Sequence, residues 1–230
     1  MMSLTNQKNL AKEAAGKEAA KLIQDQSIVG LGTGSTAYFF IQALIKRCQD
    51  GLKIKAVSSS EVSAKQASDG GIEVIDLNEV ARIDITVDGA DEIDPQKRMI
   101  KGGGGALLRE KMVASASGEM IVVVDESKVV DRLGAFPLPV EVNPFGYKLI
   151  KRQIEKHGFR AELRKKKGQI YITDNGNYIL DLQFQHLSGE PEEHDRVLKA
   201  IPGVLETGFF FGLAGRVIVA DQKGKVKIWT

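Results

Sequence analysis

The sequence has few of the residues that mark secreted, metal-binding or membrane-spanning proteins. Among its 230 residues, Cys48 is the only cysteine, so no disulfide can form within the chain and a reducing compartment is expected. The three histidines lack the spacing of zinc ligands or of a histidine-based catalytic triad. No apolar run approaches the roughly 20 residues that a membrane span needs, and residues 1–12 lack the apolar region of a signal peptide. We therefore predict a cytoplasmic protein with no membrane partner.

An excess of charge of one sign is also missing. The 32 Lys and Arg residues and the 30 Asp and Glu residues leave a net charge of +2, whereas a nucleic-acid-binding protein needs a dense basic stripe. No nucleic-acid partner is therefore expected. The one basic run, Arg164 to Lys167, precedes Gly168 and predicts a solvated hairpin turn.

The order of the apolar segments predicts an α/β fold. In the first half of the chain, short apolar runs alternate with helical patterns, which is typical of a parallel sheet covered on both faces. These runs lie at 28–31, 54–57, 72–75, 83–87 and 120–124. Beyond Gly134 the order becomes strand, helix, strand, strand, helix, strand, which favours a ferredoxin-like unit.

These patterns predict two domains. A Rossmann-like parallel-sheet domain is expected over 1–133 plus 212–230, and a smaller inserted α+β domain, serving oligomerisation, over 134–211. Within the insert, Asp174-Asn175-Gly176-Asn177 predicts a hairpin turn between strands at 170–173 and 178–182. A single strand is predicted at 204–211.

A glycine-rich turn follows the first predicted strand. Residues 30–36, Gly-Leu-Gly-Thr-Gly-Ser-Thr, join that strand to a predicted helix, whose N-terminal N–H groups can bind an anion. Ser35 stands where the third glycine of a dinucleotide-binding fingerprint belongs, and no ribose-binding acid follows the next strand. The turn therefore slightly favours phosphate binding over an ordinary capped glycine turn, and it disfavours a nicotinamide oxidoreductase.

Acidic residues gather after the strand predicted at 83–87. Asp88, Asp91, Glu92 and Asp94 follow its carboxyl end, which is where open α/β sheets bind ligands. Cation coordination, binding of substrate hydroxyls, proton transfer and a solvated acidic loop all remain open. The spacing excludes an EF-hand, while a Mg²⁺ site stays conceivable.

Four consecutive glycines follow Lys101. Such a run costs backbone entropy and is typical of a place where the main chain must pass close to another group. The helix predicted at 106–117 argues against a flexible linker. Lys101 can hold an anionic oxygen. Glu110, one to two turns into the helix, can project back toward the glycines, the alternative being an exposed helix residue. Lys128 follows the strand at 120–124, which places it at the same sheet edge as the other segments.

Several motifs occur together in an order and spacing that resembles the type A ribose-5-phosphate isomerase family. They are GLGTGSTA, VSSS, DGADEID, KGGGGALLREK, DESK and FPLPVEV, with TDNGN and AIPGV further on. The resemblance runs from about Asn9 to the C-terminus. It implies interconversion of ribose 5-phosphate and ribulose 5-phosphate through an enediol(ate), in the non-oxidative branch of the pentose phosphate pathway. It also implies the absence of a metal and of an organic cofactor, and assembly as a homodimer or a dimer of dimers, of which the homodimer is the prediction. One departure is Gly105, where alanine is expected.

The resemblance implies roles for individual residues. Glu110 would move the proton between C1 and C2, and Lys101 would stabilise the enediolate oxygen. Asp88 and Asp91 would handle hydroxyl protons and ring opening. The implied contacts to the substrate and its phosphate are Thr33, Gly34, Ser35, Thr36, Gly89, Ala90, Gly102, Gly103, Gly104 and Lys128. Lys12 is a further candidate for the phosphate.

Two other functions compete with this one. An amino-sugar-phosphate deaminase-like enzyme would favour a histidine near the acidic segment, and the sequence has none there. A non-catalytic sugar-phosphate sensor would usually carry a DNA-binding helical segment, for which no room is expected before Asn9.

Overall fold

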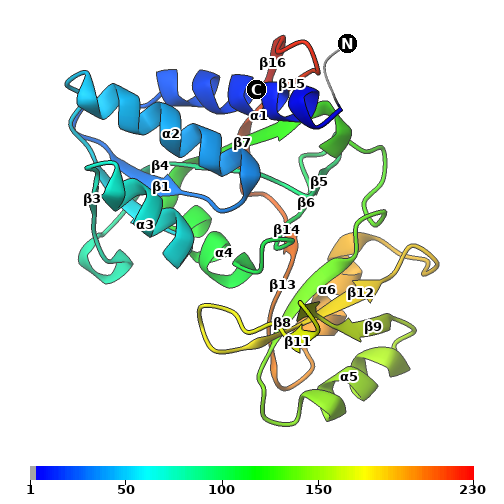
Figure 1. Cartoon of the computed structure of the whole chain (residues 1–230). Coiled ribbons are helices and arrows are strands. Elements are labelled where there is room, and N and C mark those ends of the chain that lie inside the picture. The colour runs from blue at the N-terminus through cyan, green and yellow to red at the C-terminus, as the bar shows by residue number, and fades with distance from the viewer. Residues whose placement is uncertain (1–3) are drawn as a thin grey trace. The chain divides into compact units, whose positions relative to one another are not determined.

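The computed structural model describes residues 4–230, which form two compact units (Figure 1). Unit 1 comprises the described residues up to Ala90, Arg109–Val129 and Leu213–Thr230, and unit 2 comprises Asp91–Leu108 and Val130–Gly212. These bounds differ from the predicted ones at 130–133 and at 212, and mainly at 91–108. The reason is pairing, because the two short strands in that segment form a sheet with residues 209–210.

Unit 1 is built around a seven-stranded sheet in the order β16-β15-β7-β4-β1-β2-β3, in which only the β15–β16 pair is antiparallel. The strands are β1 (Ile28–Leu31), β2 (Lys55–Ser58), β3 (Glu73–Val74), β4 (Ile83–Asp88), β7 (Ser117–Asp125), β15 (Ala214–Ala220) and β16 (Val226–Trp229). The order runs outward in both directions from β1 and β4, so the doubly wound Rossmann-like prediction is confirmed. In such sheets the ligand site lies where the order reverses, at the carboxyl ends of β1 and β4.

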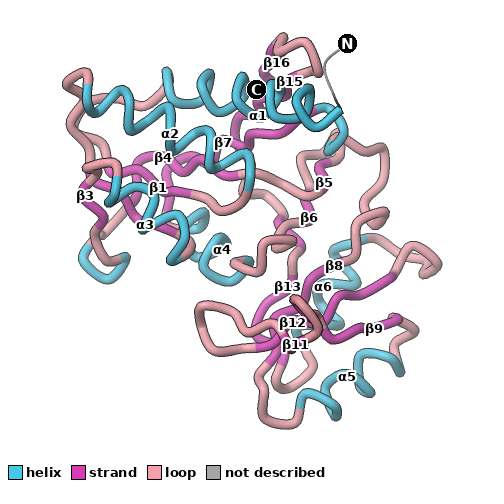
Figure 2. The backbone as a smooth tube through the Cα atoms, viewed as in Figure 1, coloured by secondary structure: helices cyan, strands magenta, loops and turns pink. Residues whose placement is uncertain are grey.

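Helices cover both faces of this sheet. They are α1 (Leu4–Lys21), α2 (Ser35–Gln49), α3 (Glu61–Asp69) and α4 (Leu107–Ser115), with short 3₁₀ helices η1 (Leu77–Glu79) and η2 (Glu126–Lys128). α1 and α2 lie side by side (Figures 1 and 2) and share one core with Val29 and Leu31. Gly16 of α1 allows this close approach, since a Cβ there would lie 2.6 Å from the backbone nitrogen of Phe40. Side chains alternate along a strand, so Gly30 faces the opposite side, where Val113 of α4 packs.

Unit 2 contains a four-stranded antiparallel sheet in the order β13-β8-β12-β9, with two helices packed on it. Along the chain the elements are β8 (Leu138–Val142), α5 (Tyr147–Lys156), β9 (Arg160–Leu163), β12 (Tyr178–Gln183), α6 (Pro191–Lys199) and β13 (Val204–Thr207). The predicted ferredoxin-like order is therefore confirmed. A three-stranded sheet of β5 (Glu92–Ile93), β6 (Met99–Ile100) and β14 (Phe209–Phe210), and a ribbon of β10 (Lys165–Lys166) and β11 (Gln169–Ile170), complete the unit.

The hairpin predicted between 170–173 and 178–182 is wrong. β11 pairs with β10, and residues 173–177 form a loop around a fully buried carboxylate. Oε1 of Glu141 accepts hydrogen bonds from the Thr173 hydroxyl at 3.0 Å and from the side-chain amides of Asn175 and Asn177 at 3.0 and 2.8 Å. Buried polar groups require such partners. The polar residues of the loop therefore bind Glu141, and the segments before and after the loop do not pair with each other as strands.

The strand predicted at 204–211 is divided into β13 and β14 at Gly208. A Cβ at this position would collide with the carbonyl oxygen of Lys101, and the N–H of Gly208 donates to the carbonyl of Pro139 at 2.7 Å. The close backbone approach lets the chain pass from the four-stranded sheet to the three-stranded one.

Two expectations from composition concern Cys48 and the membrane. The thiol of Cys48 is half-buried at the edge of the unit 1 core, and burial raises its pKa. In the described part of the chain, no helix combines the length and apolar character that a bilayer crossing requires.

Candidate active site

The turn after β1 leads directly into α2 and collects polar groups in unit 1. Gly34 is the N-cap of α2 with φ 106°, a conformation that favours glycine, and it brings no side chain to occupy the first N–H groups of the helix. The ammonium group of Lys12 donates to the Ser35 hydroxyl at 2.9 Å. The helix N-terminus, a hydroxyl and a cation therefore lie together, a combination that can bind a phosphate.

Hydroxyl groups from the segment after β2 and from the start of α3 form hydrogen bonds with this turn. The Thr33 hydroxyl lies 2.8 Å from those of Ser59 and Ser60. Ser59 donates to the carbonyl of Leu31 at 2.9 Å, and Ser63 donates to the carbonyl of Gly32 at 2.7 Å. The sequence pattern does not predict this role of the serines, although Ser58, Ser59 and Ser60 form a visible run at the end of β2.

Asp88 ends β4 beside the same turn. Its carboxylate is 1% exposed, and Oδ1 accepts the N–H groups of Thr33 at 3.0 Å and Gly89 at 2.7 Å. A Cβ at Gly32 would collide with this carboxylate, and one at Gly89 would lie 3.9 Å from Cβ of Thr36. The structure therefore brings Asp88 and the predicted phosphate-binding turn together where the strand order reverses.

Glu110 lies in the first turn of α4 and is 3% exposed. It precedes Val113 by three residues, so both side chains lie on the helix face that packs on the sheet. The alternative of an exposed helix residue is therefore excluded.

Lys128 is half-buried in η2, directly after the carboxyl end of β7. Ala90 is half-buried and follows Gly89 after β4.

In unit 2, the Asp91 carboxylate forms a hydrogen bond with the glycine run. Oδ2 of Asp91 accepts the N–H of Gly103 at 2.7 Å, and a Cβ at Gly103 would lie 2.6 Å from Oδ1 of the same carboxylate. Lys101 follows β6 and is 2% exposed, with its N–H bonded to the carbonyl of Gly208 at 2.8 Å. Its Nζ lies 5.4 Å from the ring centroid of Phe210, a cation–π distance.

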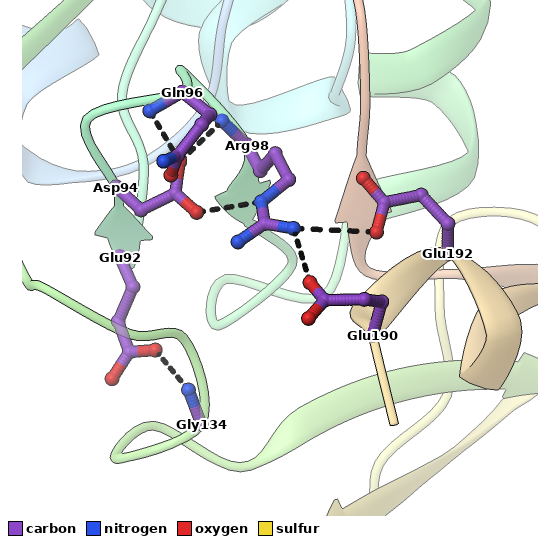
Figure 3. A network of polar contacts seen from close by, with 7 residues as sticks. All are labelled: Glu92, Asp94, Gln96, Arg98, Gly134, Glu190 and Glu192. Carbon is purple, nitrogen blue, oxygen red and sulfur yellow. Dashed lines mark hydrogen bonds and ion pairs between the residues drawn. The ribbon is translucent and has the colours of Figure 1, made fainter.

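The other two acids of this segment, Glu92 and Asp94, accept hydrogen bonds from backbone N–H groups and from an arginine (Figure 3). Glu92 accepts the N–H groups of Gly134 at 2.6 Å and Phe136 at 2.5 Å. Asp94, 0% exposed, accepts the N–H groups of Gln96 and Arg98 at 3.0 and 2.9 Å, and Nε of Arg98 at 2.7 Å. The Arg98 guanidinium also reaches Glu190 and Glu192. Within residues 4–230, no three His, Cys, Asp or Glu side chains are grouped as a metal site.

The predicted residues therefore fall into two sets. The set in unit 1 lies in the turn after β1 and the start of α2, at the end of β4 and just after it, in α4 and in η2 after β7. It comprises Thr33, Gly34, Ser35, Thr36, Asp88, Gly89, Ala90, Glu110 and Lys128. The set in unit 2 comprises Asp91, Lys101, Gly102, Gly103 and Gly104. Along the chain, the glycine run follows β6 of the three-stranded sheet and not a strand of the parallel sheet.

Comparison with known proteins gives the family. Residues 55–224 match the model of ribose 5-phosphate isomerase A (phosphoriboisomerase A). Ribose-5-phosphate isomerase A of Protochlamydia amoebophila is 55% identical over 220 residues, which are 95% of this chain and 94% of that protein. The solved structure of ribose 5-phosphate isomerase A from Methanocaldococcus jannaschii is 38% identical with a TM-score of 0.89, covering 96% of this chain and 98% of that one. A solved D-ribose-5-phosphate isomerase in complex with phospho-erythronic acid is 38% identical with a TM-score of 0.90, covering 99% of both chains. The chain belongs to the ribose 5-phosphate isomerase A family and is an isomerase that interconverts ribose 5-phosphate and ribulose 5-phosphate.

Proposed function

We propose that Glu110 is the base of this isomerisation. In the open-chain aldose, its carboxylate removes the proton from C2, which gives an enediolate, and then returns that proton to C1 of the ketose. The proton on O2 passes to O1, so the isomerisation balances without an external oxidant or reductant. The observation that carries this proposal is the burial of Glu110 on the packed face of α4, because a carboxylate shielded from water is the better proton acceptor.

The other assigned residues act on the oxygens of the substrate. Lys101 stabilises the negative oxygen of the enediolate, together with the N–H groups of the glycines that follow it. Asp88 and Asp91 carry the hydroxyl protons during ring opening and between O1 and O2. Support comes from their fixed orientation, since Oδ1 of Asp88 accepts two backbone N–H groups and Oδ2 of Asp91 accepts that of Gly103.

The phosphate is assigned to the start of α2. Ser35, Thr36 and the turn before them supply hydroxyl and N–H donors, and Lys12 and Lys128 supply positive charge. A solved relative is in complex with phospho-erythronic acid, which supports a phosphorylated, sugar-like ligand for this chain. Binding energy from the phosphate orients the reacting carbons.

Substitution of the base tests the mechanism. Glu110→Gln keeps the shape of the side chain but cannot accept the proton, so kcat on ribose 5-phosphate falls by about 10²–10⁴-fold with little change in melting temperature. Glu79→Gln, an exposed glutamate of the same unit, is the matched control and keeps full activity. Near-wild-type turnover by the Glu110 variant would remove this residue from its assigned role.

The chain is further proposed to work as a cytoplasmic homodimer in the non-oxidative branch of the pentose phosphate pathway, with unit 2 serving assembly. Unit 2 exposes large apolar side chains, with Phe145 at 93%, Leu149 at 53% and Leu205 at 41% exposure, and such residues are common in interfaces. Sedimentation of the wild type and of Phe145→Asp tests this. A monomer at micromolar concentration in the wild type would contradict it.

A further inference from the structure

The first residue of the basic run is not solvated, contrary to the prediction. The side chain of Arg164 is only 14% exposed, and it forms two bonds to Asp181 of β12. Nε donates to Oδ2 at 2.9 Å and Nη2 donates to Oδ1. This is the bidentate geometry that fixes a guanidinium in one plane. Lys165 and Lys166, the next two residues, are exposed as predicted.

The remaining nitrogen of Arg164 is directed at the glycine run. Nη1 donates to the carbonyl oxygens of Gly102 at 2.8 Å and Gly103 at 3.2 Å. The hydroxyl of Tyr171 donates to the carbonyl of Gly104 at 3.1 Å. Three consecutive carbonyl groups are therefore bound by two side chains, and these two residues are themselves linked, because the N–H of Tyr171 donates to the carbonyl of Arg164 at 3.0 Å.

The Tyr171 contact also accounts for the departure at Gly105. A Cβ at this position would collide with the hydroxyl and ring of Tyr171, and Gly105 has φ 89°. Alanine, the residue expected here, would displace the tyrosine. The glycine therefore allows Tyr171 to lie against the run and to bind its carbonyl.

We propose that Arg164, oriented by Asp181, is a positioning residue for residues 101–104, and that Tyr171 is a second one. The inference rests on the proposed function, which assigns Lys101 and the glycine N–H groups to the enediolate. Glycines restrict the backbone least, so four in succession need external contacts to keep one conformation. On the opposite side the N–H of Gly103 is already held by Asp91. Bonds to the carbonyls complete that restraint.

Kinetics of variants at these positions give the first test. Arg164→Ala lowers kcat by about 10- to 100-fold with little change in KM, because misplacement by about 1 Å is enough to slow a reaction to this extent. Arg164→Lys does not restore kcat, since one ammonium cannot bind both Asp181 and the carbonyls. Tyr171→Phe and Asp181→Asn give smaller losses. Lys165→Ala, in the same basic run, is the control and keeps wild-type kinetics.

Chemical rescue separates positioning from mere stabilisation. Millimolar guanidinium ion restores part of kcat in Arg164→Ala and leaves the wild type and Lys165→Ala unchanged, because the free cation can occupy the vacated position beside Asp181. A structural role alone would show the opposite, since guanidinium destabilises folded proteins. Wild-type kcat in Arg164→Ala, or a loss without rescue that follows the melting temperature, would overturn the proposal.

Amide hydrogen exchange tests the restraint without reference to activity. Peptides covering residues 101–105 exchange faster in Arg164→Ala and in Tyr171→Phe than in the wild type, while peptides of β12 beyond Asp181 are unchanged. Equal exchange in all variants would refute the positioning role. If exchange rises as expected but Glu110→Gln retains full turnover, the positioning of the run stands and the assigned chemistry is what fails.

Discussion

Removal of the Glu92 carboxylate is expected to destabilise unit 2 more than any change at an exposed acid. Glu92 is 3% exposed, and one of its oxygens accepts the N–H of Gly134 (Figure 3). The other oxygen accepts the N–H of Phe136. Gly134 is buried and Phe136 is half-buried. In Glu92→Ala both donors lose their partner, and the N–H of Gly134 has little access to replacement water.

The size of the effect follows from these two bonds. Hydrogen bonds to a charged group contribute about 1.5–3 kcal/mol each, so two give about 3–6 kcal/mol. Water that reaches the half-buried Phe136 N–H recovers part of this, which leaves a loss of about 3–5 kcal/mol for Glu92→Ala. Glu92→Gln retains one acceptor but turns an NH₂ group toward the second donor, so about half of that loss is expected. Glu162→Gln, an exposed acid on β9, changes stability by less than about 0.5 kcal/mol.

Because the chain has two units, the assay must report on unit 2. The only tryptophan, Trp229, lies in unit 1, so its fluorescence follows that unit. Urea unfolding is therefore followed both by fluorescence and by hydrogen exchange of peptides that contain Gly134 and Phe136. Earlier opening of these peptides, with a smaller shift of the tryptophan signal, supports the prediction. Equal stability of Glu92→Ala and Glu162→Gln would refute the assigned role of the carboxylate.

Three further predictions concern the phosphate, metals and pH. Lys128→Ala mainly raises KM for ribose 5-phosphate, and an unchanged KM would remove the phosphate contact. Activity persists after treatment with EDTA, and its loss with recovery on added Mg²⁺ would favour a metal at the acidic segment. Hydrogen bonds from Arg216 lower the pKa of the Glu119 carboxyl below 4.5, so their contribution to stability is present above that pH and is lost as the pH falls through the lowered pKa. In Glu119→Gln the melting temperature therefore falls less steeply as the pH is lowered. The same dependence of melting temperature on pH in wild type and variant would contradict this.

The architecture could be predicted because it depends on local patterns. Alternating apolar runs and helices specify a parallel sheet, and the strand and helix order after Gly134 specifies the ferredoxin-like unit. Glu110 and Asp88 could be located because each lies at a defined place on a predicted element, three residues before Val113 or at the end of β4.

Contacts distant in sequence could not be predicted in the same way. The basic run has the composition of an exposed turn, and nothing near Arg164 in the sequence points to Asp181 or to glycines 61 and 62 residues away. The loop 173–177 has strong turn residues, but they bind Glu141, a partner more than 30 residues away. The turn residues therefore predict the change of direction correctly, whereas the predicted pairing of the flanking strands is wrong.

The acidic segment shows how a cluster of like charges is divided between structure and chemistry. Both oxygens of Glu92 and both oxygens of Asp94 accept N–H donors, so a cation at either residue would compete with hydrogen bonds that are already formed. The donors also neutralise part of the repulsion that crowded carboxylates would exert on each other. Asp88 and Asp91, at the other end of the segment, are instead held next to the two glycine-rich turns. Hydroxyl-proton transfer therefore remains the role that we propose for Asp88 and Asp91, while Glu92 and Asp94 bind donors of the protein itself.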